Sequence, residues 1–300
     1  MSRPFDDFER LLAALPEPDE AARAAALTAA GGFGRLTDLA AWLAGWRGQS
    51  APRVRRPIVA LYAAAQAGAG DPEGAARRRL DALAAGEGPI SDAAREVGAG
   101  VEVFDLAVDR PSPDAALRAA MSERECAATL AFGMEALAKT PDLLIVGETA
   151  SGADRAAGAL ANALFGGASA DWAADPDWTA EATARAREEG AATPLDFLAH
   201  LGGRETAALV GAILAARTQS TPVVLDGYAA LAAGAVLQAL RPDALDHCVL
   251  AQGGTAPGSR LLAERLGLRP LVDAPLERSQ GLAGIAALGL LRVACALQAQ

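Results

Sequence analysis

The segment 141–152 holds the residue with the clearest chemical potential, a glutamate that directly follows an apolar run. The run 143–146 leads into Gly147 and Glu148, and small residues and an Ala-rich stretch come next. This order predicts a strand, a turn and a helix. Because ligands of parallel α/β sheets bind at the carboxyl ends of the strands, we expect Glu148 at the mouth of a site. Gly152 would then lie in a loop that lets a ligand approach the backbone and the first amides of the helix.

Two roles for Glu148 stay open at this point. A carboxylate at a strand end beside an apolar helix can have a raised pKa and serve as a general base. Alternatively, Glu148 caps the following helix or pairs with an arginine.

Two further glycine-containing segments are candidate ligand contacts. Gly202 and Gly203 precede a predicted helix that opens with Glu205, so their amides could face a ligand, or they could simply start the helix with a carboxylate on its dipole. Asp226 and Gly227 follow a buried run directly. Asp226 could hold a ribose hydroxyl or orient an arginine, or it could end the strand as a turn.

The loop before the last helix is a fourth candidate. It contains Gln280 and Gly281 after a charged pair, Glu277 and Arg278. The Gln280 amide can hydrogen-bond but cannot take up a proton at neutral pH. A loop that only caps the helix is the alternative.

The composition excludes several other kinds of chemistry. A net charge of −10 argues against a nucleic-acid backbone or an anionic membrane as partner. Lys139 is the only lysine, so neither Schiff-base chemistry nor a phosphate-binding loop of the Walker type is expected. His200 and His247 are the only histidines, so we predict neither a metal site nor a Ser-His-Asp triad, and we expect no cofactor.

Three features of the sequence predict a cytoplasmic protein. Residues 1–7 are polar and acidic, unlike a signal peptide. The apolar segment 281–291 stops at Arg292 and is too short to span a bilayer. Widely spaced cysteines predict buried, reduced thiols at Cys126, Cys248 and Cys295.

Short apolar runs alternate with helical patterns along the chain. Strands are predicted at 58–62, 101–106, 143–146, 222–225, 248–251 and 271–272. Helices are predicted at about 5–15, 19–30, 36–46, 72–86, 112–138, 153–165, 204–217, 228–240, 257–266 and 281–299. The fold class is therefore α/β, with a doubly wound parallel sheet. The segment 168–187, acidic at its start, predicts an excursion from the sheet, as a lid or a subunit contact. Trp42 and Trp46 are expected in the core.

The order and spacing of several segments resemble the family of nicotinate-nucleotide:dimethylbenzimidazole phosphoribosyltransferases over nearly the whole chain. The segments that carry this resemblance are Gly34-Arg-Leu36, Trp42-Leu-Ala-Gly45, Pro57-Ile-Val-Ala-Leu-Tyr62, Val146-Gly-Glu148, Gly202-Gly-Arg-Glu205, Pro222-Val-Val-Leu-Asp-Gly227, Pro257-Gly258, Glu264-Arg-Leu-Gly267 and the closing helix.

This resemblance implies a fold, a reaction and an assembly. The sheet domain would span 51–277, with a smaller helical domain built from 1–50 and 278–300, usually as a homodimer. The reaction would move phosphoribose from nicotinate mononucleotide to a benzimidazole, in the assembly of the lower ligand of cobalamin. A carboxylate of the last loop would take the benzimidazole proton. The substrate contacts would include Gly147, Gly152, Gly202, Gly203, Asp226, Gly227, Gly258 and Gly281.

The chain departs from the family pattern where the chemistry should occur. The family's Gly-Glu-Gly in the last loop is Ser279-Gln280-Gly281, so an amide stands at the position of the base. The family's Asp-His-Gly is Ala65-Gln66-Ala67, and its Gly-Ile-Gly-Asn-Thr loop is Ala150-Ser-Gly-Ala-Asp154. The early lysine appears as Thr28, a serine as Gly254, and Glu-Pro-Gly-His as Ala256-Pro-Gly-Ser259.

Two hypotheses follow. In the first, the chain is a phosphoribosyltransferase in which Glu148 survives as the working carboxylate. In the second, it is a non-catalytic relative that binds a small ligand or acts as a regulatory subunit with an active paralogue. Asp154 favours the second, because it would put negative charge where a phosphate should bind.

Overall fold

Six parallel strands form the centre of the protein. The computed structural model describes residues 3–70, 74–274, 276 and 281–298. The strands are β1 (Pro57–Ala63), β2 (Gly100–Asp105), β3 (Leu143–Glu148), β4 (Val223–Leu225), β5 (Cys248–Gln252) and β6 (Pro270–Val272). Their order in the sheet is β2-β1-β3-β4-β5-β6, with every pair parallel. The predicted strands and the doubly wound fold class are confirmed.

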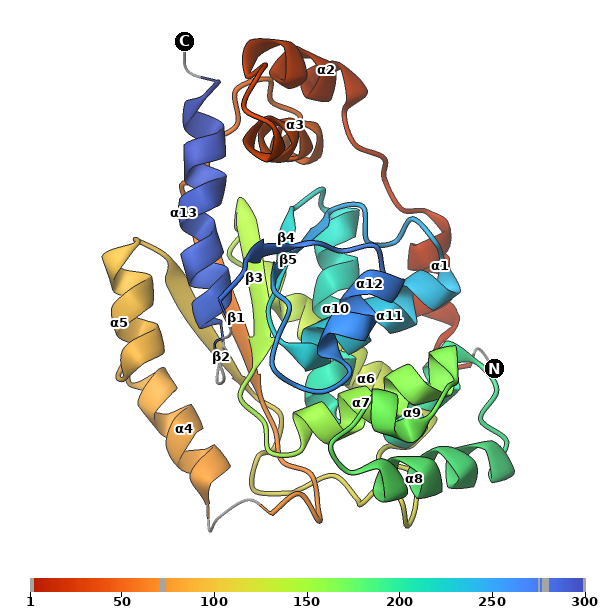
Figure 1. The fold of residues 1–300 in the computed structure, drawn as a ribbon. Coiled ribbons are helices and arrows are strands. Elements are labelled where there is room, and N and C mark those ends of the chain that lie inside the picture. Colours follow the sequence, from red (N-terminus) through yellow and green to blue (C-terminus); the bar gives the residue numbers. More distant parts are fainter. Residues whose placement is uncertain (1–2, 71–73, 275, 277–280, 299–300) are drawn as a thin grey trace.

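Helices cover both faces of this sheet (Figure 1). They are α1 (Asp6–Ala13), α2 (Glu20–Ala29), α3 (Arg35–Arg47), α4 (Ala75–Ala84), α5 (Pro89–Glu96), α6 (Glu123–Gly133), α7 (Ala153–Phe165), α8 (Pro176–Glu188), α9 (Pro194–Leu201), α10 (Arg204–Thr218), α11 (Tyr228–Leu240), α12 (Ser259–Arg265) and α13 (Leu282–Ala296). Two short 3-10 turns, Met134–Leu137 and Ser169–Asp171, lie between them.

Alternation of side chains along the strands divides the core into two layers. Ile58, Ala60 and Tyr62 of β1 face one cluster of buried residues, whereas Val59 and Leu61 face the other. The central strands β1, β3 and β4 are buried on both faces, which explains why the sequence shows continuous apolar runs there rather than an alternation of polar and apolar residues.

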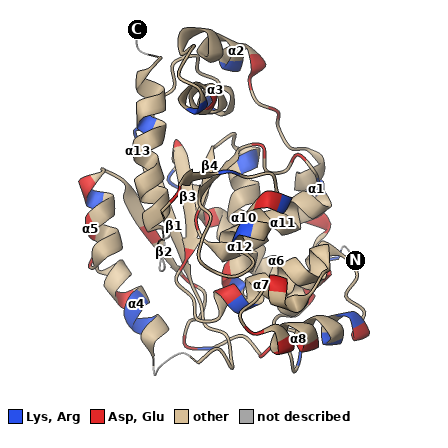
Figure 2. Ribbon diagram, in the orientation of Figure 1, with Lys and Arg blue, Asp and Glu red and all other residues tan. Residues whose placement is uncertain are grey.

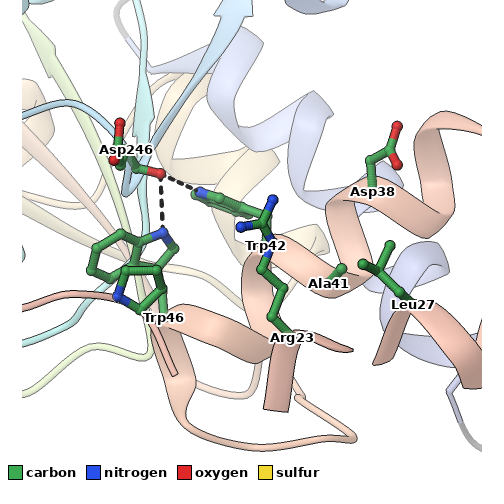
Figure 3. Close-up of a pocket in the computed structure, with 8 residues that line it drawn as sticks. Arg23, Leu27, Asp38, Ala41, Trp42, Trp46 and Asp246 are labelled. Carbon is green, nitrogen blue, oxygen red and sulfur yellow. Dashed lines mark hydrogen bonds between the residues drawn. The ribbon is translucent and has the colours of Figure 1, made fainter. Parts of the chain in front are cut away.

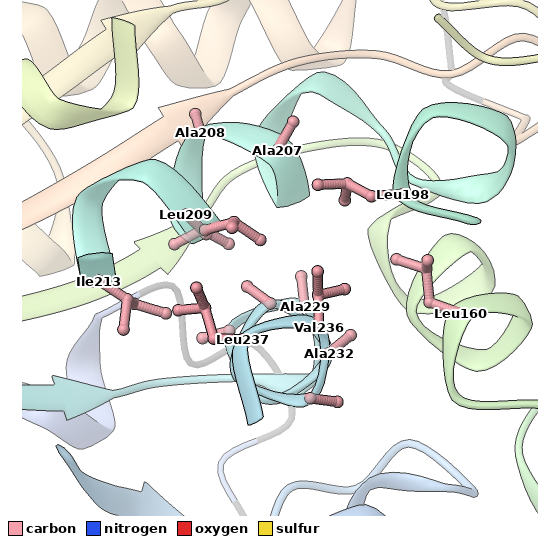
Figure 4. Packing of buried hydrophobic residues seen from close by; sticks show 14 of the residues in the cluster. Leu160, Leu198, Ala207, Ala208, Leu209, Ile213, Ala229, Ala232, Val236 and Leu237 are labelled. Carbon is pink, nitrogen blue, oxygen red and sulfur yellow. The ribbon is translucent and has the colours of Figure 1, made fainter. Parts of the chain in front are cut away.

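The larger layer consists of α6, α7, α9, α10 and α11, and alanine lets these helices approach closely (Figure 4). A methyl group on Gly133 of α6 would lie 2.0 Å from the carbonyl oxygen of Ala208, and one on Gly211 of α10 would lie 1.9 Å from that of Leu130. The high Ala and Gly content is therefore a packing feature of this layer.

The helices of the chain ends divide between the two layers. Phe5 and Phe8 of α1 belong to the layer of α10, whereas Leu39 of α3 and Leu288 of α13 pack on the opposite face of the sheet. The charged residues are unevenly distributed among the helices, since α13 carries few of them and α4 and α8 carry many (Figure 2). The division into a small helical domain and a sheet domain stays a prediction.

The helix predicted over 112–138 is wrong in its first half, because α6 begins only at Glu123. Prolines flank Ser112, and its backbone instead bridges to the loop after β1. The Ser112 N–H donates to the Ala65 carbonyl (2.9 Å), and its carbonyl accepts from the Ala67 N–H (2.8 Å). A helix cannot form where these groups are already committed and where proline removes donors.

Further predictions from the sequence concern the cysteines, the two tryptophans, membrane spans and the segment 168–187. All three cysteines are buried and free. Trp46 is 3% exposed and Trp42 is half-buried. Within the described part of the chain, every helix falls short of the length and apolar character that a membrane span needs. The excursion 168–187 folds as the 3-10 turn Ser169–Asp171 and most of α8, and whether it acts as a lid or a subunit contact stays a prediction.

Candidate functional site

A pocket of about 360 Å³ lies at the carboxyl end of β3, where the fold predicts a ligand. Its walls come from the end of β3, the start of α7, the segment before α8, the start of α11 and the loop before α12. The described residues that line it are Glu148, Ala150, Gly152, Ala153, Asp154, Arg155, Trp172, Ala173, Ala174, Asp175, Tyr228, Ala256 and Pro257.

Glu148 is the last residue of β3 and is half-buried in this wall. Its Oε2 accepts a hydrogen bond from the Ala150 N–H, so the strand end and the turn hold it in place. Burial raises its pKa to about 8; the Ala150 N–H opposes this rise, and the nearby carboxylates of Asp154 and Glu205 add to it. A carboxyl group near neutrality can hold or release a proton, which is the property expected of a general base.

The start of α7 has the geometry of an anion site but not the charge. Gly152 caps this helix with φ of +91°, a conformation that suits glycine. Asp154 then places a carboxylate in the first turn, where the helix dipole stabilises negative charge. The amides that could bind a phosphate therefore already have an anion beside them.

Arg155 is the one cation among the described lining residues, and it is engaged elsewhere. Its guanidinium donates to the carbonyl oxygens of Ala67 (3.1 Å) and Gly68 (3.2 Å) and lies 3.9 Å from the centroid of the Trp178 ring. It also approaches Asp114 at 3.8 Å. Arg155 thus fastens the loop after β1 to α8 rather than serving the pocket.

Three of the predicted residues meet beside Glu148. A methyl group on Gly147 would lie 3.4 Å from both the Asp226 carbonyl oxygen and the Gly281 nitrogen. The Asp226 carboxylate, 1% exposed, accepts from the Gly284 N–H of α13 (2.9 Å). Asp226 therefore anchors the start of α13 next to β3. Gln280, the residue before Gly281, lies outside the described residues.

A buried carboxyl group lies behind the pocket. Glu205 is fully buried, and the Gln66 side-chain amide donates to its Oε1 (2.6 Å). Its Oε2 has no hydrogen-bond partner among the described residues. Burial raises the pKa of Glu205 to about 7, although the Gln66 hydrogen bond opposes this shift.

The predicted glycines Gly202 and Gly203 lie at the start of α10, where Gly203 is close to the Glu205 carboxylate. A methyl group on Gly203 would lie 2.1 Å from Glu205 Oε1, and one on Gly202 would lie 2.7 Å from the Leu198 carbonyl oxygen. Neither glycine lines the pocket. They form the junction of α9 and α10, and whether their amides contact a ligand stays a prediction.

The segment before α8 closes the pocket on the far side. The Trp172 indole N–H donates to the Gly166 carbonyl (2.7 Å), and the Tyr228 hydroxyl donates to the Trp172 carbonyl (2.9 Å). A methyl group on Gly258 would lie 2.2 Å from the Tyr228 hydroxyl oxygen, so this predicted glycine permits a close approach. Gly227 caps α11 with φ of +98° and faces open space.

Sequence reasoning missed the roles of Trp172, Tyr228 and Arg155. The tryptophan stood in a segment interpreted as an excursion, and the tyrosine stood one residue after Gly227. Tyr228 directly follows Gly227 and Arg155 directly follows Asp154, and this adjacency to predicted site residues was the available signal. No group of three or more His, Cys, Asp or Glu side chains in the described ranges is arranged to hold a metal ion.

A second pocket, of about 440 Å³, lies at the other ends of the strands (Figure 3). The indole nitrogens of Trp42 and Trp46 both donate to the Asp246 carbonyl oxygen (3.0 Å each). Asp246 lies just before β5, so these side chains tie α3 to the amino end of that strand.

The fold and the site together define a doubly wound α/β protein with a small-molecule pocket at the carboxyl ends of its strands. A family model described as "Phosphoribosyltransferase" matches residues 16–300. The chain is 40% identical to nicotinate-nucleotide–dimethylbenzimidazole phosphoribosyltransferase of Brucella anthropi over 314 residues, which cover 97% of this chain and 93% of that protein. It is 40% identical to the protein of the same name in Rhizobium rhizogenes over 316 residues, 98% and 93% of the two chains.

Solved structures agree. A crystal structure of the protein of that name from Thermus thermophilus superimposes with a TM-score of 0.82 at 26% identity, covering 99% of this chain and 96% of that one. The chain therefore belongs to the nicotinate-nucleotide:dimethylbenzimidazole phosphoribosyltransferase family.

Proposed function

We propose that this chain keeps the ligand pocket of its family but does not transfer phosphoribose, and that it acts as a small-ligand-binding protein, alone or as a regulatory partner of a complete family member. The observation that carries this proposal is the position of Asp154. Its carboxylate lies in the first turn of α7 and acts electrostatically on Glu148. A phosphate at these amides would meet two acidic groups and no free cation among the described lining residues.

The sequence supports the same conclusion at the base. The resemblance pairs Gln280 with the glutamate of the family's Gly-Glu-Gly, and an amide cannot accept the benzimidazole proton. Loss of a well-placed base typically lowers a rate by about 10²–10⁴-fold. Loss of the phosphate contacts as well would weaken substrate binding and positioning together.

Phosphoribosyl transfer is the second candidate, and Glu148 favours it. Its pKa of about 8 is close to neutrality, and among the described residues only Ala150 donates to it. In this alternative, Glu148 would take the proton of the benzimidazole so that the ring nitrogen attacks C1′ of the ribose.

One assay separates these candidates. The purified protein, at high concentration, is mixed with nicotinate mononucleotide and 5,6-dimethylbenzimidazole, and nicotinate release is followed, with the Brucella anthropi relative as positive control. We expect no release. Turnover that Glu148→Gln abolishes would establish the second candidate and reject the first.

A substitution in the last loop tests the account of Asp154. Gln280→Glu restores a carboxylate but leaves Asp154 in place, so we expect it to remain inactive. Robust turnover by this single variant would mean that the phosphate still binds, and the argument from Asp154 would be wrong. Adding Asp154→Asn to Gln280→Glu is the matched step expected to improve binding of nicotinate mononucleotide.

We also propose that the chain forms a homodimer, as the family resemblance implies. Its outer helix α13 supports this, because Leu290 is 37% and Val293 is 50% exposed on a face with little charge. Light scattering after size exclusion tests it, and Val293→Glu should shift a dimer toward monomer.

A further inference from the structure

We propose that the ligand of the Glu148 pocket is a small organic cation, in which an apolar or aromatic body carries a positively charged nitrogen. This inference rests on the proposed ligand-binding function and names the class of ligand for that same site. It follows from the volume of the pocket, from its apolar lining and from the acidic side chains of Glu148, Asp154 and Asp175.

The apolar part of the lining suits an organic body. Trp172 and Tyr228 contribute to one wall, and small residues such as Ala150, Ala173 and Ala256 make up much of the rest. A volume of about 360 Å³ falls within the range of small-molecule pockets. Both aromatic residues are held in place, since the Tyr228 hydroxyl donates to the Trp172 carbonyl. Trp172 is 1% exposed and its ring stacks on Phe165, so this wall offers packed apolar surface rather than an open aromatic face.

The charged part of the lining is negative on three sides. Glu148 ends β3, Asp154 lies in the first turn of α7, and Asp175 precedes α8 and caps it by accepting from the Trp178 N–H (3.2 Å). Arg155, the lining cation, is engaged with backbone carbonyls and the Trp178 ring. A bound anion would meet three acidic side chains in this wall and one arginine that is engaged elsewhere except for its Nε, whereas a cation would gain up to three partners.

A buried, unpartnered oxygen adds to this deficit of positive charge. Glu205 is 0% exposed, and its Oε2 has no hydrogen-bond partner among the described residues. The Glu205 carboxylate is close enough to help raise the pKa of Glu148. Glu205 is not among the described residues that line the pocket, so it adds negative charge behind the wall rather than a direct contact with a ligand.

A metal ion fits the site less well than an organic cation. Within the described residues, no three or more acidic, histidine or cysteine side chains converge as metal ligands do. The carboxylates instead lie around a space that has room for a molecule.

The proposal also predicts an exchange of protons. Burial raises the pKa of Glu148 to about 8 against the opposing charge of Arg79 on α4, and burial raises the pKa of Asp154 above its usual range, so ionisation of Glu148 near neutrality is disfavoured without a bound cation. A bound cation favours the ionised carboxylate and expels its proton. Binding should therefore release protons, and affinity should rise as the pH is raised through the pKa of Glu148.

The test compares two ring compounds that differ in charge but hardly in shape. Isothermal titration above the pKa of Glu148 measures the binding of 1,3-dimethylbenzimidazolium, a permanent cation, and of 1,2-dimethylbenzimidazole, a neutral analogue of similar size and shape. We expect the cation to bind at least about tenfold more tightly. Glu148→Gln and Asp154→Asn should each weaken cation binding by about tenfold and leave the neutral ring unchanged, while Asp177→Asn, which removes an acidic residue outside the lining, should have no effect.

Each other outcome overturns a defined part of the argument. Equal binding of the two rings would reject the cation and leave the ligand-binding function standing. Binding of neither ring would reject the cation, and a thermal shift with inorganic phosphate instead would show that the pocket takes anions. Nicotinate release in the transfer assay would reject the proposed function itself, whatever the titrations give.

Discussion

At the amino ends of the strands, Trp42 and Trp46 both donate to the Asp246 carbonyl oxygen, whereas at the carboxyl ends Glu148 receives one hydrogen bond, from the Ala150 N–H. The amino-end cluster of Trp42, Trp46, Arg217 and His247 is bonded mainly to backbone. Arg217 donates to the Pro16 and Asp243 carbonyls, although its Nη2 has no hydrogen-bond partner among the described residues, and His247 Nε2 lies 2.9 Å from the Ile213 carbonyl oxygen.

This difference separates polar groups that support the fold from groups that cost it stability. Burial lowers the pKa of His247 to about 3, so this ring is neutral and acts as a core residue. The carboxyl-end groups Glu148 and Glu205 have raised pKa values because their hydrogen bonds offset the effect of burial only in part. Such unfavourable burial is typical of sites kept for function rather than for stability.

The largest expected effect is at the amino end. Trp46→Ala should lower the free energy of unfolding by about 3–5 kcal/mol, because it opens a cavity and removes the ring that lies 4.2 Å from the Arg217 guanidinium. Urea denaturation measures the loss. Ligand affinity at the Glu148 pocket should stay within about twofold. A loss of affinity with little loss of stability would abolish the distinction between the two ends.

Substitution of Glu148 is expected to raise the free energy of unfolding at high pH, whereas substitution of Trp46 lowers it. Its pKa is about 8 in the folded protein against 4.5 ordinarily, so the unfolded chain gives up its proton first as the pH rises. Stability from this residue therefore falls between about pH 4.5 and pH 8 and stays lower above that range. Glu148→Gln cannot ionise and should be more stable than wild type at about pH 9, by on the order of 1–3 kcal/mol, and similar at about pH 4.

Urea denaturation across this pH range decides the point. Asp177→Asn, on the exposed side of α8, serves as a control that removes one carboxylate without altering the pH dependence. If Glu148→Gln destabilises the protein above the pKa of Glu148, the carboxylate supports the fold and the comparison between the two ends is wrong.

A wall substitution should affect both stability and binding. Gly258→Ala places a methyl group 2.2 Å from the Tyr228 hydroxyl oxygen and 2.6 Å from the Trp172 carbonyl oxygen, so their hydrogen bond must shift. We expect a loss of about 1–3 kcal/mol and weaker cation binding. Gly267→Ala, which has open space around it but a φ of +69°, is a control for backbone strain alone.

The smallest expected losses of stability come from removing a single polar contact. Trp46→Phe keeps a ring but removes the donor to Asp246, and it should cost about 1 kcal/mol. Lys139→Ala breaks the ion pair between the exposed Lys139 ammonium and the largely buried Glu102 carboxylate, and it should cost about 1 kcal/mol or less. Thermal denaturation of both variants, measured together, should preserve this order.

Much of the fold could be predicted because its signals are local. Continuous apolar runs indicated the strands, and the glutamate after 143–146 marked the strand end that lines the pocket. The non-helical path of 112–122 could not be predicted, because it depends on backbone hydrogen bonds between Ser112 and the distant Ala65. The Gln66–Glu205 hydrogen bond joins residues 139 positions apart, and no periodicity contains such a contact.

The sequence by itself determined the alternation of strands and helices, the family, and the amide side chain at Gln280, because these properties reside in residue types and their spacing. Only the tertiary structure decided which charges lack partners. Whether Asp226 binds a ligand or holds α13, and whether Arg155 is free or engaged, depends on atoms that chain folding brings within a few ångströms. Hydrogen bonds and burial act over such distances, so they set the pKa values and the charge of the pocket.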